Sequence, residues 1–406
     1  MEIGPIFSAL RRNKVGALLI ALQVALTLAI ICNALFIINE RLAFIARPSG
    51  IDEGNIFVIK NLWVGRGTDA ENTSLLQTDL QTLRDLPGVA DVYSTNTVPL
   101  TNGGWSDGVR LTADQEHSTT QTANYFVDEH ALNTMDIKLI AGRNFKPEEI
   151  TDRAERDSGL PDSMIVTQEF AQKMFPTESA LGKVVYMEGK KPTTIIGIID
   201  NLQVPWVGSW VKTWGYTSAL IPQRMIRQNS AYVVRAKPGQ LESTMKAAEA
   251  KLFAINPLRV IGSVRTFSEI RAKAYRGDRA MAILLSIVCG ALLIITALGI
   301  VGLASFWVTQ RRKQIGTRRA LGATRLNIVS YFLTENLLIS LAGVVLGIVL
   351  AVSLNLWLVN NFELTRLTWW YLPMGAVMIL LLGQAAVLPP ARRAASVPPA
   401  VATRSA

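Results

Sequence analysis

Four long stretches without a charged residue dominate the pattern of hydrophobic and polar positions along the chain. The first, residues 15–39, holds 25 uncharged residues, and the second, residues 280–308, holds 29. As α-helices these stretches would measure about 37 and 43 Å, more than the roughly 30 Å hydrocarbon core of a bilayer. The pattern predicts a membrane protein with four transmembrane α-helices, at residues 15–47 with a stalk, 267–308 with a second stalk, 331–361 and 367–388.

The polar region between the first two spans alternates strand-like runs with helical periodicity. Apolar and β-branched residues predict strands at residues 55–63 and 89–97, and leucines at helical spacing predict a helix at residues 73–86. The same strand-helix-strand order recurs at residues 232–266. We expect a large α+β domain at residues 48–266, inserted between helices 1 and 2. It should contain two subdomains, one formed by residues 48–135 and 226–266, the other by residues 136–225.

The formal net charge of +10 comes from the segments outside this domain. Residues 39–279 hold 28 Lys/Arg and 28 Asp/Glu, whereas the rest of the chain holds 13 and 3. Lys and Arg gather in cytoplasmic loops of membrane proteins, so the asymmetry indicates topology and argues against nucleic acid as a partner. It predicts an extracytoplasmic α+β domain, two cytoplasmic termini, a cytoplasmic amphipathic helix at residues 1–14 and a cytoplasmic tail at residues 389–406.

The segment between the second and third spans, residues 309–330, is the most basic part of the chain. Residues 310–325 carry six Lys/Arg and no acid. Ile315 and Leu321 lie among these charges at spacings that fit a short helix, and Gly316 and Gly322 permit a turn or a close approach by another backbone. These properties favour docking to a cytoplasmic partner protein.

Small and acidic residues inside the spans carry structural expectations. Gly299 and Gly302 in the second span favour close helix packing over a hinge, and Gly343 and Gly347 in the third have the small-xxx-small spacing of a helix crossing. That crossing could lie within the bundle or at a dimer seam, and the first is favoured. Glu335 begins the third span, where we expect it to pair with a loop arginine rather than to relay protons.

Catalytic and metal motifs give little support to an enzyme. A phosphate-binding loop of the form Gly-x4-Gly-Lys-Ser/Thr is absent, so we expect ATP to be bound elsewhere. Residues 104–108 read Gly-x-Ser-x-Gly, but a nucleophile elbow needs a strand, a sharp turn and a helix, and turn-forming residues surround Ser106. His117 and His130 are too few for a histidine metal cluster, and Cys32 and Cys289 lie in apolar spans. We expect no catalytic residue, no metal and no cofactor in this chain.

Three sets of residues resemble the MacB/FtsX-type permeases of ABC systems, the type VII or mechanotransmission class. They are the basic stretch with IGTRRALGAT at residues 315–324, the polar-domain stretches IAGRNFKPEEI (140–150) and MIVTQEFAQKMFPTESALGKVV (164–185), and the tail PPARRAASVPPAVA (389–402). Two departures are Gln314, where the family usually has an acid, and Val397 with Pro398, where it usually has Asp before Pro-Ala. Both departures alter the charge presented to an ATPase.

The resemblance implies a MacB-like periplasmic core domain and a location in the bacterial inner membrane. It also implies a cytoplasmic ABC ATPase dimer that binds ATP and Mg, a second permease that is identical or paralogous, and a periplasmic adaptor with an outer-membrane channel. The ATPase would be contacted by the following residues: Arg311, Arg312, Gln314, Ile315, Gly316, Arg318, Arg319, Leu321, Gly322 and Arg325.

The function implied is that of an export permease that transmits motion from a separate ATPase to its periplasmic domain, where the substrate is handled. Two alternatives share this topology. One is an FtsX-like transmitter that controls a cell-wall hydrolase, and the other is a permease that extracts lipoproteins. The length of the polar domain, about 230 residues between the spans, favours export over the division-type transmitter.

Overall fold

A computed structural model describes residues 14–65, 67–154, 159, 161–187, 191–362 and 365–396. The predicted amphipathic helix at residues 1–14 and the tail beyond residue 396 lie outside these ranges, apart from Lys14. The chain divides into two units. We call Met1–Ala46 with Gly277–Ala406 the helical unit, and Arg47–Arg276 the α/β unit. Within these described ranges four helices are long and apolar enough to cross a membrane, and the α/β unit lies in the chain between the first two, which confirms the predicted fold class.

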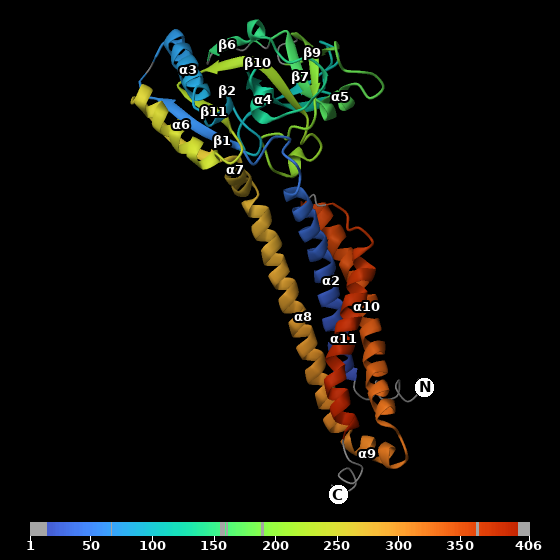
Figure 1. The fold of residues 1–406 in the computed structure, drawn as a ribbon. Helices are drawn as coiled ribbons and strands as arrows, with labels where there is room; N and C mark the ends of the chain where they lie inside the picture. The colour runs from blue at the N-terminus through green and yellow to red at the C-terminus, as the bar shows by residue number, and fades with distance from the viewer. Residues whose placement is uncertain are drawn as a thin grey trace. The chain divides into compact units, whose positions relative to one another are not determined.

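The helical unit is built around α2 and α10, which pack along each other with α11 beside both (Figure 1). Its buried core includes Val24 and Leu28 of α2, Ala351 of α10 and Ile379 of α11. The helices have the following bounds: α2 Lys14–Ile45, α8 Arg276–Gln310, α9 Arg312–Ala320, α10 Arg325–Phe362 and α11 Tyr371–Ala395.

Two glycines bring α10 against the backbone of α2. A Cβ atom at Gly343 would lie 2.6 Å from the carbonyl oxygen of Ala21, and one at Gly347 would lie 3.0 Å from Cα of Ala25. The first distance is too short for a side chain and the second is unusually tight, so glycine favours this crossing. The crossing lies within the bundle, the alternative that the sequence favoured.

The long helix α8 contacts α2 through both apolar and polar groups, with Cys289 clustered against Ile31 and Ala34. The side-chain amide of Gln23 donates a 3.0 Å hydrogen bond to the carbonyl of Ile295, and the hydroxyls of Thr27 and Thr296 share one of 2.8 Å. A Cβ atom at Gly299 would lie 2.5 Å from Oε1 of Gln23. Gly302 differs, because within the described residues no atom lies within 4 Å of its Cβ position. Its assignment to helix packing stays a prediction.

The predicted tail at residues 389–406 begins too early, because the last helix extends into it. Pro389 and Pro390 were expected to end the fourth span, but α11 continues through both to Ala395. Each interior proline costs about 3 kcal/mol through its missing N–H group and its ring. Ala391 and Ala394 are fully buried, and Arg319 donates a 2.6 Å hydrogen bond to the carbonyl of Ala395. This packing and capping offset the cost of the prolines.

The predicted stalk at residues 267–308 is also not one helix. It breaks at Tyr275, between α7 (Phe267–Ala274) and α8. Phe267 and Tyr275 are fully buried, and the side-chain amide of Gln203 donates a 2.8 Å hydrogen bond to the Tyr275 hydroxyl. The residues before the break therefore belong to the packing of the α/β unit.

One part of the α/β unit is a four-stranded antiparallel sheet in the order β12-β1-β11-β2. One face of it packs against two helices, with Leu76 and Leu80 of α3 and Leu252 of α6 in the shared core. A capping box between Thr68 and Glu71 starts α3 before the predicted residue 73. The bounds are β12 Arg259–Thr266, β1 Ile56–Trp63, β11 Asn229–Ala236, β2 Val89–Thr95, α3 Asp69–Arg84 and α6 Leu241–Ile255.

The other part is an eight-stranded mixed sheet in the order β3-β4-β10-β7-β9-β5, with β6 on β10 and β8 on β9. Its core includes Phe170 of α5, Met164 and Ile195. The bounds are β3 Trp105–Val109, β4 Thr120–Val127, α4 Ala131–Met135, β5 Leu139–Gly142, η1 Pro147–Glu149, β6 Thr151–Ala154, β7 Ser163–Thr167, α5 Gln168–Met174, β8 Val184–Tyr186, β9 Pro192–Ile199, η3 Ser209–Val211 and β10 Ser218–Ile226.

This topology corrects the boundary between the subdomains. Residues 48–135 were expected to stay with the first sheet, yet β3 and β4 lie in the second. The reason is the parallel pairing of β4 with β10, which places Ala123 beside Ser218. That pairing joins strands far apart in the chain, so local order could not indicate it.

Candidate functional site

The basic segment forms a helix whose inner side is anchored in the helical unit. Ile315, on α9, is 5% exposed and belongs to the same core cluster as Trp307, Ile328 and Phe332. Gly316 is buried beside it. After α9, Gly322 has φ +97°, a left-handed conformation that glycine adopts without strain, and the chain turns into α10. Gly322 therefore makes the turn, whereas Gly316 lies inside the helix.

A buried ion pair fastens the start of this segment to the third span. Nη1 of Arg311 lies 2.7 and 2.9 Å from the two carboxylate oxygens of Glu335, and the side chains are 12% and 2% exposed. This confirms the expectation that a loop arginine pairs with Glu335. Because a charge at this depth is costly without a partner, the pair holds α9 against α10.

Two more predicted contact residues also turn toward their own unit. The guanidinium of Arg318 lies 4.9 Å from the ring centroid of Tyr331, and Arg319 caps α11 through Ala395. Together with Arg311, Ile315 and Gly316, they attach α9 to its own unit. Their assignment as ATPase contacts remains a prediction.

The outer side of the segment exposes cations together with large apolar side chains. Leu321 is 84% exposed and Leu326 is 80% exposed, although both are leucines. Arg312, Lys313 and Arg325 of the same segment are also exposed and make no ion pair with any residue the structure describes. We call these five residues the coupling face. Gln314 and Gly322 are exposed next to it.

Sequence reasoning missed Leu326. The available signal was a leucine between Arg325 and Asn327, directly after a glycine turn and at the start of a helix. An apolar side chain in such a polar setting has no neighbour along the chain to cover it. Exposed apolar groups that are rimmed by charge mark protein-interaction surfaces.

The serine motif of residues 104–108 does not form a nucleophile elbow. Ser106 lies within β3, an edge strand paired with β4 opposite Ala123, and no helix follows it directly. Across the described parts of the chain, no group of three or more His, Cys, Asp or Glu side chains could hold a metal ion.

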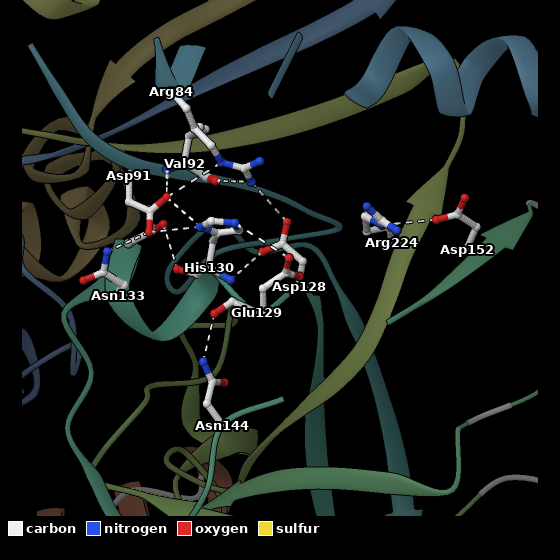
Figure 2. Close-up of polar contacts among 11 residues, drawn as sticks. Arg84, Asp91, Val92, Asp128, Glu129, His130, Asn133, Asn144, Asp152 and Arg224 are labelled. Atoms are coloured by element: carbon white, nitrogen blue, oxygen red, sulfur yellow. Dashed lines mark hydrogen bonds and ion pairs between the residues drawn. The ribbon is translucent and has the colours of Figure 1, made fainter. Parts of the chain in front are cut away.

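A second polar centre lies in the α/β unit around His130 (Figure 2). Nδ1 of His130 lies 3.0 Å from a carboxylate oxygen of Asp91, and the amide of Asn133 donates a 2.7 Å hydrogen bond to the same carboxylate. Arg84 reaches the carbonyl of Val92 at 3.0 Å and lies 3.7 Å from Asp128. These groups connect β2 and α3 to the turn before α4. The centre therefore joins the two sheets of the unit.

The environment shifts three pKa values in this centre. The hydrogen bond to Asp91 raises the pKa of His130 above its usual value. Burial acts to raise the pKa of Asp91, but hydrogen bonds from His130, Asn133 and the Val92 amide outweigh it and lower that pKa. Burial and the nearby Glu129 raise the pKa of Asp128 to about 6. The centre thus favours a charged His130–Asp91 pair beside a carboxyl group that is readily protonated.

These shifts predict a pH-dependent stability. The pKa of His130 is higher in the folded state than the usual value of about 6.5. Protonated His130 therefore contributes fully to the free energy of unfolding below about pH 6.5, and this contribution is lost as the pH rises through the folded-state pKa. His130→Gln should lower the unfolding temperature of the α/β unit by about 2–4 °C at pH 6 and by less at pH 8. Thermal unfolding of the full chain in detergent at both pH values measures this.

His117→Gln is the matched control, because His117 is exposed. It should leave the pH dependence unchanged. An equal loss at pH 6 and pH 8 for His130→Gln would contradict the role assigned to its charge.

Comparisons with known proteins agree with this architecture. A model described as MacB-like periplasmic core domain matches residues 18–252, and one described as FtsX-like permease C-terminal matches residues 286–399. The ABC transporter permease YknZ of Bacillus subtilis is 22% identical over 343 residues, covering 82% of this chain and 80% of that protein.

A macrolide export ATP-binding/permease protein MacB, from Chromobacterium violaceum, is 26% identical over 223 residues, 54% of this chain and 33% of that protein. The MacB of Neisseria gonorrhoeae is 24% identical over 306 residues, 74% of this chain and 45% of that protein. The chain thus spans between a third and a half of the length of these MacB relatives.

The crystal structure of the periplasmic region of MacB from Actinobacillus actinomycetemcomitans aligns with a TM-score of 0.35 and 15% identity, covering 57% of this chain and 97% of that one. The family models carry the assignment, since the first alone matches more than half of the chain. With four membrane-length helices, this chain belongs to the MacB- and FtsX-like family of ABC transporter permeases, proteins of the bacterial inner membrane.

Proposed function

We propose that this chain is the permease of an ABC export system and passes motion from a cytoplasmic ATPase dimer to its α/β unit. The observation that carries the proposal is the coupling face. It combines two exposed leucines with three exposed cations that pair with no described residue, on a segment whose inner side is attached to the helical unit. Such a surface suits a partner with an apolar pocket and an acidic rim.

The anchoring of α9 supports transmission of force. An ATPase that moves the coupling face also moves Arg311 and Arg319, and through them α10 and α11. Helix α8 has 35 residues, so as a continuous helix it spans about 52 Å. A single residue, Arg311, separates it from α9. Stiff helices carry a displacement that a flexible loop would absorb. Substrate handling on the periplasmic side, with a second permease, an adaptor and an outer-membrane channel, completes the proposal.

The test is retention of the ATPase by the purified permease. Arg312→Glu combined with Arg325→Glu reverses two exposed charges of the coupling face and should reduce co-purification of the ATPase about tenfold or more, with similar loss of permease-stimulated ATP hydrolysis. Leu321→Asp should act in the same direction.

Lys246→Glu with Lys251→Glu, on the exposed side of α6, is the matched control and should leave retention unchanged. Normal retention by the coupling-face variants would refute the proposal. Affinity capture from the periplasmic side separates the alternatives, since recovery of a cell-wall hydrolase or of lipoproteins in place of an adaptor would favour a transmitter or an extraction permease.

A further inference from the structure

The four-stranded sheet of the α/β unit has a second face, opposite α3 and α6. Side chains alternate along a strand, so Phe57 and Ile59 of β1 point into the core shared with the helices, while Val58 and Lys60 point the other way. Two hollows lie on this side. One, of about 250 Å³, is lined by Lys60, Trp105 and Arg227 among others, and the other, of about 140 Å³, by Lys60, Arg265 and Lys273 among others.

Lys60 lines both hollows, and so does the loop between β2 and β3, with Leu100–Asn102 on one and Gly104 on the other. The two hollows are therefore neighbouring parts of one surface, which we call the sheet cleft. Their combined size reaches the range of small-molecule sites, roughly 300–1,000 Å³.

The charge of the sheet cleft is entirely positive. Its lining residues include Lys60, Arg227, Arg265 and Lys273, and no aspartate or glutamate. None of the four cations forms an ion pair with a residue that the structure describes. Elsewhere in the same unit arginines do find acids, as Arg235 does with Asp136 at 3.0 Å. The cleft therefore gathers four cations with no acidic group in its lining.

The cations are spaced widely enough to bind a ligand that carries more than one anionic group. In the register of β12 and β1, Arg265 lies opposite Val58 and Ser263 lies opposite Lys60. Residues two apart in a strand and one strand over are separated by about 8 Å between Cα atoms. Arg227 marks the other end of the cleft, where its guanidinium lies 5.3 Å from the ring centroid of Trp105. An indole beside a cation offers an apolar surface next to an anion-binding group.

The loop that lines the cleft is held in a strained conformation. Leu100 has φ 67°, a value that leucine rarely adopts, and Asn102 has φ 57°, which asparagine adopts more readily. The backbone N–H of Asn102 donates to the carbonyl of Pro205 at 2.9 Å, and the N–H of Val207 donates to the Asn102 side chain at 3.0 Å. Strain of this kind persists where the surroundings enforce it, often at binding sites. The wall of the cleft is therefore preformed.

We propose that the sheet cleft binds a small organic anion carrying two or more carboxylate or phosphate groups, with its apolar part against Trp105. Lys60 contacts the centre of the ligand, Arg265 and Lys273 hold one end, and Arg227 holds the other. The proposal is independent of the ATPase and of export, because it concerns binding to this chain alone.

The test is calorimetric titration of the purified full chain in nanodiscs of zwitterionic lipid. Citrate and inorganic triphosphate serve as probes for the carboxylate and phosphate classes. We expect saturable binding of at least one probe, weakened about tenfold or more by Lys60→Gln with Arg265→Gln, because each substitution removes a charge-assisted hydrogen bond. Lys273→Gln alone should weaken it less.

Lys246→Gln with Lys251→Gln removes the same charge from the exposed side of α6 and should change binding by less than about twofold. Binding of only one probe supports the proposal and identifies the anion class. The proposal fails if the wild-type chain binds neither probe, if the α6 control weakens binding as much as the cleft variant, or if the cleft variant binds as the wild type does. Thermal unfolding of each variant confirms that it is folded.

Discussion

Arg259→Met is expected to destabilise the four-stranded part of the α/β unit by about 3–5 kcal/mol, the largest effect of a single substitution outside the membrane spans. The guanidinium of Arg259 donates to both oxygens of Asp79, at 2.8 and 2.9 Å, and the side chains are 0% and 1% exposed. The Tyr232 hydroxyl donates to the same carboxylate at 2.6 Å. Removing Arg259 leaves a buried carboxylate without its counter-ion.

The contacts span the whole subdomain, since Asp79 lies on α3, Arg259 on β12 and Tyr232 on β11. Hydrogen exchange of the backbone amides in β1, β11 and β12 should therefore show an equal loss of protection in all three strands. Asp79→Leu combined with Arg259→Met should recover about 2 kcal/mol of the loss, because no unpaired charge remains. About 1–3 kcal/mol should persist, because the Tyr232 hydroxyl loses its acceptor.

The control is Arg224→Met. Arg224 pairs with Asp152 at 3.1 Å, but these side chains are 24% and 36% exposed, so water can replace the contact (Figure 2). Its loss should cost less than about 1 kcal/mol. If Arg259→Met costs no more than Arg224→Met, the buried pair does not hold the subdomain together.

Arg311→Met is expected to have the second largest effect, on both the membrane level of the protein and coupled ATP hydrolysis. Glu335 would remain 2% exposed near the start of α10 without its counter-ion, at a cost of about 3–5 kcal/mol. The end of α9 nearest α8 would also lose its attachment to the third span. Immunoblots of membranes measure the level, and ATP hydrolysis by the reconstituted complex, normalised to that level, measures coupling.

Arg311→Met with Glu335→Gln separates the two consequences. It removes the unpaired charge and should restore the membrane level, while coupling remains reduced because α9 still lacks the ion pair. Arg312→Met, one position along, changes an exposed residue and should leave the level unchanged. Full coupling in the double variant would show that the ion pair serves insertion alone.

The four transmembrane helices could be predicted from the sequence, because a run of more than twenty uncharged residues has few other interpretations. The helix ends were harder to predict. Pro389 and Pro390 signal a stop locally, but packing of Ala391 and Ala394 overrides that signal. Tyr275 gives no local sign of the break between α7 and α8, because its burial depends on Gln203, far away in the chain.

Most contacts between residues far apart in the chain could not be predicted from the sequence. The Arg259–Asp79 ion pair joins residues that are 180 positions apart in the chain, and the Asp91–Asn133 hydrogen bond joins residues that are 42 positions apart. No sequence motif links the partners in either contact. The Glu335 pair was accessible because a carboxylate in an apolar span restricts its partners to a nearby basic loop. The basic segment was recognised by charge, but only the fold separates its inner side from the coupling face.

The low burial of α8 within the chain leaves much of its apolar surface uncovered by the other helices. In its most apolar window 17% of residues are buried inside the molecule, against 44% for α2. Its contacts with α2 combine hydrogen bonds from Gln23 and Thr27 with apolar packing around Cys289. Polar contacts between helices in a bilayer contribute only about 0.6 kcal/mol each on average. Because few of its residues are buried within the chain, most of the apolar window of α8 is left for lipid or a second permease to cover.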